Sequence, residues 1–252
     1  MRFGIFVNSE KTSSFRITKE IIEVTKEFNV DSEIADKERE YEVIISLGGD
    51  GTFLAANRTF LGTPILGINL GHLGFLTEAG IEDVKNVVAK LIKKEYKIEE
   101  RALLEATVND RKMLALNDIV ISRINSARTL DLNLFFNGKH VDNYKSDGLI
   151  IATPTGSTAY SLSAGGPIVD PKLDVVVVTP ICAHSLHQRP IISDADTKIE
   201  ILGESNEFLI TADGQVAAEG RKVEIKKPNC KAKIIKLNDK CFFDIVREKF
   251  HL

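Results

Sequence analysis

Residues 48–52 have the composition of a loop that binds phosphate. They read Gly-Gly-Asp-Gly-Thr, follow a β-branched run at 42–47 that favours a strand, and precede a helix expected from Thr52. Glycines let the backbone approach a ligand closely, and the free N–H groups at a helix start attract anions. Three glycines in four residues also cost more backbone entropy than a plain turn requires. We therefore interpret Gly48, Gly49, Gly51 and Thr52 as a phosphate loop.

Asp50 lies inside this loop, where a carboxylate would repel phosphate. Such a residue is tolerated if it takes a proton from an attacking hydroxyl or binds a bridging cation. The simpler alternative is a helix cap. The sequence has no Gly-x-x-x-x-Gly-Lys-Ser/Thr string, and residues 67–74 have one residue too many between their first two glycines for the dinucleotide fingerprint. The loop by itself therefore indicates phosphoryl transfer only.

A second candidate segment, residues 147–167, is rich in hydroxyl groups. Its start favours a strand, and residues 156–163 favour a loop that leads into a short helix. Ser and Thr make a poor packing helix, but they suit hydrogen bonds to ribose and purine edges. The alternative is a Ser-capped surface helix. We interpret the segment as a site for a nucleotide.

Other candidates are weak when taken singly. Asn117-Asp118 could bind ribose hydroxyls or form a turn, and residues 212–215 are most simply a hairpin turn. His184 and His187 have no evident third ligand, so the spacing does not predict a zinc site. Basic side chains that could contact phosphate, but that are more often solvated surface charges, are Arg128, Lys145 and Arg189.

The order of elements predicts an α/β half followed by a β-rich half. Strands are expected at 2–7, 42–47 and 64–68, and helices at 14–28, 52–60 and 82–94; this alternation favours a parallel sheet with helices on its faces. From about residue 98 the apolar period becomes two, with strand-like runs at 130–136, 149–152, 175–179, 198–202, 208–211, 222–226 and 232–237. We expect a domain at 1–98, a β-rich domain at 99–238 and a tail at 239–252 with a helix at 242–250.

Composition excludes several classes of partner. The 252 residues include 33 basic and 36 acidic side chains, so no positive field recruits nucleic acid or an anionic membrane. Residues 3–7 are too short an apolar run for a signal peptide, and the longest apolar run is far short of a membrane span. Three widely spaced cysteines argue against a disulfide framework. We expect a cytoplasmic protein.

Together these motifs resemble the NAD kinases. The resemblance rests, in this order, on residues 48–52, Asn117-Asp118, residues 155–167, residues 181–190 and Asp213-Gly214-Gln215. The Gly-Gly-Asp-Gly string is shared with diacylglycerol and sphingosine kinases and with 6-phosphofructokinases. The Thr-Ala-Tyr-Ser-Leu-Ser string and the Gly-Gly-Pro after it narrow the resemblance to NAD kinases.

The resemblance implies an N-terminal α/β domain, a sandwich-like β-rich C-terminal domain and a tail that packs back on the first. It also implies a dinucleotide site between the domains and assembly as a homodimer or homotetramer. Asp50 would be the general base on the adenosine 2′-hydroxyl. The NAD-binding residues would be Asp50, Gly51, Asn117, Asp118, Arg128, Lys145, Asp147, Thr158, Ala159, Tyr160, Ser161, Leu162, Ser163 and Gln215.

The expected reaction is phosphoryl transfer from ATP, or from polyphosphate, to NAD to give NADP. A divalent ion, Mg²⁺, is expected to be held through phosphates, with no direct metal site on the protein. Two alternatives are a lipid or other small-alcohol kinase that shares the glycine loop and a dinucleotide sensor without catalysis. The first predicts an apolar acceptor cavity, and the second predicts NAD binding without product.

Overall fold

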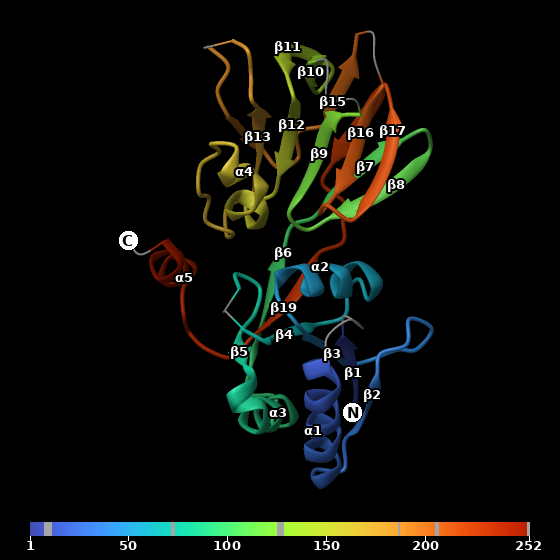
Figure 1. Ribbon diagram of the computed structural model, residues 1–252, viewed down its shortest axis with the longest axis vertical. Coiled ribbons are helices and arrows are strands. Elements are labelled where there is room, and N and C mark those ends of the chain that lie inside the picture. The colour runs from blue at the N-terminus through green and yellow to red at the C-terminus, as the bar shows by residue number, and fades with distance from the viewer. Residues whose placement is uncertain (8–11, 72–73, 125–128, 186, 205–206, 251–252) are drawn as a thin grey trace. The chain divides into compact units, whose positions relative to one another are not determined.

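The structure is a computed structural model that describes residues 1–7, 12–71, 74–124, 129–185, 187–204 and 207–250. It is rich in β-sheet and has few helices (Figure 1). The chain divides into two compact units, one formed by Met1–Glu100 with Lys231–Leu252 and the other by Arg101–Cys230. The chain therefore leaves the first unit and later returns to it. In the part of the chain that the structure describes, no helix has the length and apolarity needed to cross a bilayer.

A seven-stranded sheet forms the centre of the first unit, in the order β2-β1-β3-β4-β19-β6, with β5 also paired to β4. The pairs of β1 with β2 and β3, and of β4 with β3, β5 and β19, are parallel. β3 and β4 are buried at every position, as expected of strands covered on both faces. The strands are β1 (Arg2–Val7), β2 (Asp31–Ile34), β3 (Val43–Leu47), β4 (Ile65–Asn69), β5 (Ala79–Gly80), β6 (Lys97–Arg101) and β19 (Ala232–Lys236).

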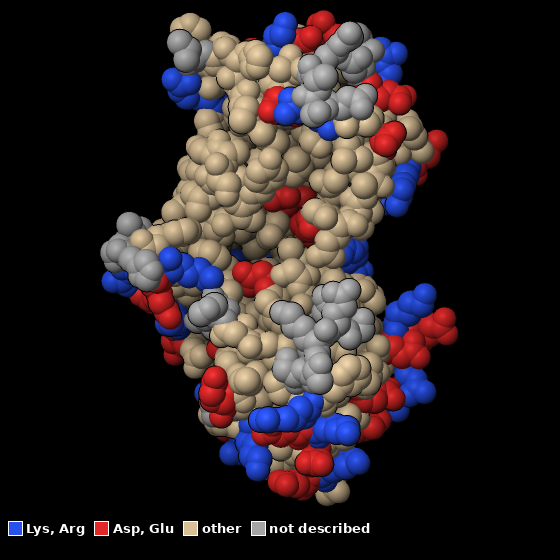
Figure 2. Space-filling view, viewed as in Figure 1, with Lys and Arg blue, Asp and Glu red and all other residues tan. Residues whose placement is uncertain are grey.

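Helices cover both faces of this sheet. α1 (Thr12–Glu27) and α3 (Val84–Ile92), the latter preceded by a 3₁₀ turn η1 (Ile81–Asp83), lie on one face, and α2 (Asp50–Thr59) lies on the other (Figure 1). Ile21 of α1 and Val88 of α3 share one apolar cluster with Ile45 of β3. Charged side chains gather over α1 on its solvent side, which is the pattern of an amphipathic surface helix (Figure 2).

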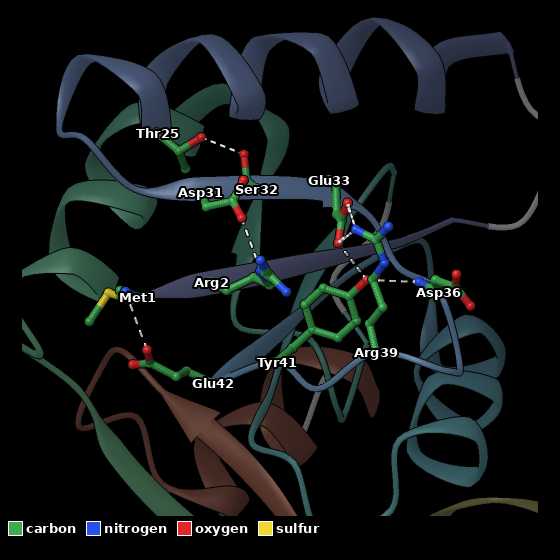
Figure 3. Close-up of polar contacts among 10 residues, drawn as sticks. All are labelled: Met1, Arg2, Thr25, Asp31, Ser32, Glu33, Asp36, Arg39, Tyr41 and Glu42. Carbon is green, nitrogen blue, oxygen red and sulfur yellow. Dashed lines mark hydrogen bonds and ion pairs between the residues drawn. The ribbon is translucent and has the colours of Figure 1, made fainter.

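Side chains at the edge strand β2 form a polar network (Figure 3). Glu33 accepts two hydrogen bonds from Arg39, at 2.9 and 2.7 Å, and one from the Tyr41 hydroxyl at 3.1 Å. The Tyr41 hydroxyl in turn accepts the backbone N–H of Asp36 at 2.9 Å, and its ring packs edge-on against Phe60. Since Phe60 is the C-cap of α2, this network anchors the far end of the helix that starts at Asp50.

The second unit contains two six-stranded antiparallel sheets, ordered β11-β10-β15-β18-β7-β8 and β14-β13-β12-β9-β16-β17. The first of these has strands β7 (Leu104–Val108), β8 (Arg111–Ala115), β10 (Leu130–Phe136), β11 (Lys139–Ser146), β15 (Ile199–Gly203) and β18 (Lys222–Lys226). The second has β9 (Asp118–Arg123), β12 (Gly148–Ala152), β13 (Val175–Ile181), β14 (Ile191–Asp194), β16 (Phe208–Ala212) and β17 (Val216–Gly220).

One apolar cluster joins the two sheets into a sandwich. It takes Leu132 and Ile201 from the first sheet and Ile121, Ile151 and Phe208 from the second, all fully buried. The outer face of the second sheet is also covered, because Ile150 and Val177 pack with Val169. Val169 belongs to the segment after β12, which contains the 3₁₀ turn η2 (Thr155–Thr158) and α4 (Tyr160–Ser163). The hydroxyl-rich segment therefore lies on this sheet.

Two of the differences from the sequence expectation concern β19 and the start of α2. The run at 232–237, expected in the β-rich half, forms β19 of the parallel sheet, where Ile234 pairs with Ile65. A short alternating apolar run has the same period in either kind of sheet, so periodicity could not assign it. The helix expected from Thr52 begins at Asp50, because Gly49 is its extended N-cap residue. Asp50 thus belongs to the first turn of α2.

Candidate functional site

The turn between β3 and α2 requires glycine at only one of its three glycine positions. A Cβ atom on Gly48 would lie 2.2 Å from Thr52 Oγ1, so a side chain there is excluded by the turn itself. A Cβ atom on Gly49 or Gly51 would meet nothing within 4 Å. These two glycines leave open space at the positive end of α2, which suits the close approach of an anion.

The Asp50 carboxylate is oriented by backbone donors from a distant segment. The N–H of Phe75 donates to Oδ2 at 3.0 Å, and the N–H of Leu76 donates to Oδ1 at 3.0 Å. A carboxylate oxygen can accept about two hydrogen bonds, so each oxygen keeps capacity for a substrate hydroxyl. The arrangement holds Asp50 as an acceptor at the start of the helix.

Residues 74–78 form a compact loop around this carboxylate, hereafter the 74–78 loop. The N–H of Gly74 donates to Thr77 Oγ1 at 2.7 Å, and the N–H of Glu78 donates to the Gly67 carbonyl at 2.9 Å. A Cβ atom on Gly67 would lie 2.7 Å from the Leu76 carbonyl oxygen, so the loop packs directly on β4. The sequence prediction missed this loop, because Gly74 was considered only within a dinucleotide fingerprint that does not fit.

Three motifs that lie far apart in the sequence meet at one end of the second sheet of the second unit. Ala152 at the end of β12 pairs with Asp118 at the start of β9, and Ala212 at the end of β16 pairs with Ile119. The loops beside these residues carry Asn117-Asp118, the hydroxyl-rich segment and Asp213-Gly214-Gln215. The structure therefore brings these three groups together.

Asp213 joins two of these loops. Its carboxylate accepts the backbone N–H groups of Leu116 at 3.0 Å, Asn117 at 2.8 Å and Asp118 at 3.3 Å. Asp213 itself has a left-handed backbone, with φ of 50°, in the turn between β16 and β17. The residue is thus both a turn residue, as predicted, and the anchor of the 116–118 loop, which was not predicted.

The loop that follows β12, with Thr153 and Gly156, packs on the backbone of Leu116 and Asn117. The Thr153 hydroxyl donates to the Leu116 carbonyl at 2.6 Å, and the Thr153 N–H donates to the Asn117 carbonyl at 2.9 Å. A Cβ atom on Gly156 would lie 2.0 Å from the Asn117 carbonyl oxygen, so this close approach requires glycine. Much of the segment's hydroxyl and glycine content is therefore structural.

Asp118 is buried beside Asp213. Burial, with a smaller contribution from the charge of Asp213, raises the pKa of the Asp118 carboxyl from 3.8 to about 7. A buried carboxyl of this kind costs stability in its ionised form unless a ligand hydroxyl or another donor approaches it. Perturbed groups of this kind are common at functional sites.

The predicted binding residues at 158–163, which run from the end of η2 through α4, divide into buried and accessible ones. Ser161 is fully buried, and its hydroxyl is hydrogen-bonded to that of Thr179 at 2.8 Å, so it fastens α4 to β13. Thr158, Ala159 and Leu162 are half-buried, whereas Tyr160 and Ser163 are exposed. On the face drawn in Figure 2, few charged side chains cover the region of α4.

Lys145 and Asp147 lie away from this cluster, at the opposite end of β12. Asp147 precedes Gly148, which pairs with Ser122, and its carboxylate forms an ion pair with Arg123 at 2.9 Å. The Lys145 carbonyl accepts the N–H of His184 at 2.9 Å. Gln215 is exposed in the β16–β17 turn. Arg128, predicted to bind NAD, lies outside the residues that the structure describes.

Comparison with known proteins identifies the family. Residues 6–96 match the family described as the ATP-NAD kinase N-terminal domain, and residues 116–237 match the ATP-NAD kinase C-terminal domain. A NAD kinase of Caldicellulosiruptor saccharolyticus is 41% identical over 258 residues, covering 99% of each chain. The chain belongs to the NAD kinase family.

Further NAD kinases agree in sequence and in fold. One from Caldanaerobacter subterraneus is 46% identical over 223 residues, covering 82% of this chain and 78% of its own. The structure is similar to the crystal structure of a NAD kinase from Archaeoglobus fulgidus in complex with ATP, with a TM-score of 0.87, 30% identity and coverage of 100% and 99%. It is also similar to yeast NADH kinase complexed with NADH, with a TM-score of 0.85, 26% identity and coverage of 100% and 87%.

Proposed function

We propose that this member of the NAD kinase family, a phosphotransferase that converts NAD to NADP, takes its phosphoryl group from ATP and uses Asp50 as the general base. The observation that carries the proposal is the position of the Asp50 carboxylate. Two backbone N–H groups hold it at the start of α2, beside Gly49 and Gly51, whose Cβ positions are open. The ATP complex of the Archaeoglobus fulgidus relative supports the donor. Polyphosphate is the alternative donor.

The chemistry asked of the protein is alignment and proton removal. The γ-phosphoryl group passes from ATP to the 2′-hydroxyl of the adenosine ribose, and the hydroxyl proton passes to a carboxylate oxygen of Asp50. Because both Asp50 oxygens are already oriented by N–H donors, the carboxylate needs little reorganisation when the hydroxyl arrives. Gly48, Gly49, Gly51 and Thr52 would form the phosphate loop.

We assign the dinucleotide to the second-unit residues named above. The meeting of Asn117, Asp118 and the hydroxyl-rich segment at one sheet end supports binding of ribose and adenine there. Lys145 and Asp147 lie at the other end of β12, one strand length from Asn117 and Asp118. An extended dinucleotide would cover that distance, whereas a mononucleotide would not. Thr158, Tyr160 and Ser163 present the side chains that a ligand can reach.

The expected divalent ion would be bound mainly through the triphosphate. Among the described residues there is no group of three or more His, Cys, Asp or Glu side chains that could hold a metal ion. Mg²⁺ would neutralise charge on the phosphate oxygens.

We also propose a cytoplasmic homodimer or homotetramer. Among the described residues, large apolar side chains of the second unit that are exposed by a third or more, and so available for an interface, are Ile124, Val141, Tyr160, Ile168, Leu173 and Ile192. Light scattering of the purified protein measures the assembly directly. A monomer at micromolar concentration would contradict the homo-oligomer.

The function is tested by assaying NADP formation in the wild type, in Asp50→Asn and in Asp110→Asn, a control at an exposed acidic residue. Loss of a general base should lower kcat by roughly 10²- to 10⁴-fold. Near-normal kcat in Asp50→Asn would remove Asp50 from the base role. Calorimetric titration of NAD then separates the alternatives, because a sensor binds NAD without forming product and a lipid kinase does neither.

A further inference from the structure

The segment from Lys236, the last residue of β19, to Phe250 contacts the 74–78 loop at both of its ends. At one end the Phe75 ring lies 6.2 Å from the ring of Phe242 and 6.2 Å from that of Phe250, both of α5 (Phe242–Phe250). The Lys249 ammonium lies 5.1 Å from the centre of the same Phe75 ring, within the range of a cation–π contact. Three side chains of α5 therefore surround Phe75.

At the other end Glu78 is held by the same segment. Its carboxylate forms an ion pair with Lys236 and accepts the backbone N–H of Leu237 at 3.1 Å. Both charged side chains are largely buried, at 5% exposed for Glu78 and 13% for Lys236. A buried, hydrogen-bonded pair of this kind is costly to break, because either partner alone would be an uncompensated charge.

Between these two anchors lie the N–H groups that orient Asp50. The Phe75 ring packs on Phe242 of α5, and the Phe75 N–H donates to Asp50 Oδ2. This one residue therefore links α5 to Asp50. The adjacent N–H of Leu76 binds Asp50 Oδ1. α5 is itself fixed at its start, where the Asp244 carboxylate accepts the Cys241 N–H at 2.9 Å, and by buried Ile245 and Val246.

We infer that residues 236–250 are a positioning element for Asp50: by fixing Phe75 and Glu78 they fix the two donors that aim the carboxylate. The inference rests on the proposed role of Asp50 as base. Phe242, Phe250, Lys249 and Lys236 touch no reacting group and act through the loop. Displacement of a catalytic group by about 1 Å can cost on the order of 100-fold in rate, so loosening the loop should lower kcat.

The first test measures the loop itself. In the double variant Phe242→Ala/Phe250→Ala, the amides of Phe75 and Leu76 should exchange with solvent deuterium at least about tenfold faster, while amides of β4 keep their rates. Phe28→Ala is the matched control, because Phe28 is an exposed phenylalanine of the same unit that lies outside residues 236–250. Unchanged exchange at Phe75 and Leu76 in the folded double variant would overturn the inference.

The second test asks whether the effect passes through Asp50. We expect kcat for NADP formation to fall roughly 10- to 100-fold in the double variant, and Phe242→Leu/Phe250→Leu to recover most of it. In the Asp50→Asn background the same double variant should cause little further loss. An equal loss in both backgrounds would show that α5 acts by another route and would overturn the inference.

Two further measurements distinguish a failed positioning role from a variant that does not fold and from a failed base assignment. If the double variant does not fold, Lys249→Met removes only the contact over Phe75 and should speed exchange of that amide roughly two- to fivefold; no change there counts against the positioning role. If Asp50→Asn keeps wild-type kcat, the base assignment fails, whereas the exchange data still decide whether α5 orders the 74–78 loop.

Discussion

Gly74 lies so close to Asp50 that a Cβ atom on it would come 2.0 Å from Asp50 Oδ1. The absence of a side chain at Gly74 is thus a condition for the carboxylate position.

Gly74→Ala should therefore displace Asp50 while leaving the fold intact. We expect kcat for NADP formation to fall on the order of 10- to 100-fold, because the carboxylate must leave its two N–H donors. Steady-state kinetics measure the loss of kcat, and a thermal melt checks that the fold is kept. Gly71→Ala is the control, since a Cβ atom there meets nothing within 4 Å; equal activity of the two variants would contradict the argument.

Gly51→Ala should make the protein more stable and less active. Gly51 lies in the first turn of α2, its φ is not positive and its Cβ position is open, so alanine fits the helix. Replacing helical glycine by alanine contributes about 0.5–1 kcal/mol. A methyl group would occupy the space we assign to a phosphate. Urea unfolding and NADP formation are the measurements, and an active, stabilised variant would show that the space is not used.

Stability should depend on pH through Asp118. Its pKa is raised from 3.8 to about 7, mainly by burial, so between these values the unfolded chain binds fewer protons than the folded one. The free energy of unfolding therefore falls as pH rises through that window. Asp118→Asn has no carboxyl group to titrate at this position. The free energy of unfolding of the variant minus that of the wild type should therefore increase by on the order of 2 kcal/mol from pH 5 to pH 8.

Urea titrations at pH 5, 6, 7 and 8 check this sign. Asp110→Asn is the control, because Asp110 is an exposed turn residue whose substitution should give the same difference at every pH. Parallel curves for wild type and Asp118→Asn would contradict the assignment.

Asp213→Asn should loosen the 116–118 loop. The amide keeps one acceptor oxygen but presents an NH₂ group in place of the other, so either the N–H of Leu116 or the N–H groups of Asn117 and Asp118 lose their acceptor. We expect a loss of roughly 1–3 kcal/mol and a higher KM for NAD. Asn tolerates the left-handed backbone at φ 50°, and Asp110→Asn, at φ 63°, is the matched control. Equal stability of the two variants would argue against the anchor.

The sequence indicates the parts of the candidate site that depend on residue type. Gly48–Thr52, Asn117-Asp118 and the hydroxyl-rich segment carry side chains or glycines whose chemistry is visible in the chain, and the family assignment followed from them. It did not predict the 74–78 loop, because the loop acts through backbone N–H groups that nearly every residue possesses. The anchor role of Asp213 was hidden for a related reason, since its partners are backbone donors nearly 100 positions earlier.

The sequence also did not predict which side chains of the short helix α4 point into the protein. Ser161 and Ser163 looked equivalent as hydroxyls of a binding helix, yet one is fully buried against Thr179 and the other is exposed. In so short a helix, direction is decided by the sheet beneath it. The strand at 232–236 shows the same limit for topology, because its pattern does not say which sheet it joins.

The place of β19 between β4 and β6 has a consequence for synthesis on the ribosome. The second unit is continuous in sequence, so it can fold as soon as residue 230 has emerged. The first unit, although synthesised earlier, lacks an inner strand of its sheet until residues 232–236 follow. During that interval the edge of β4 stays open to unwanted strand pairing. We therefore expect the half that is made first to be completed last.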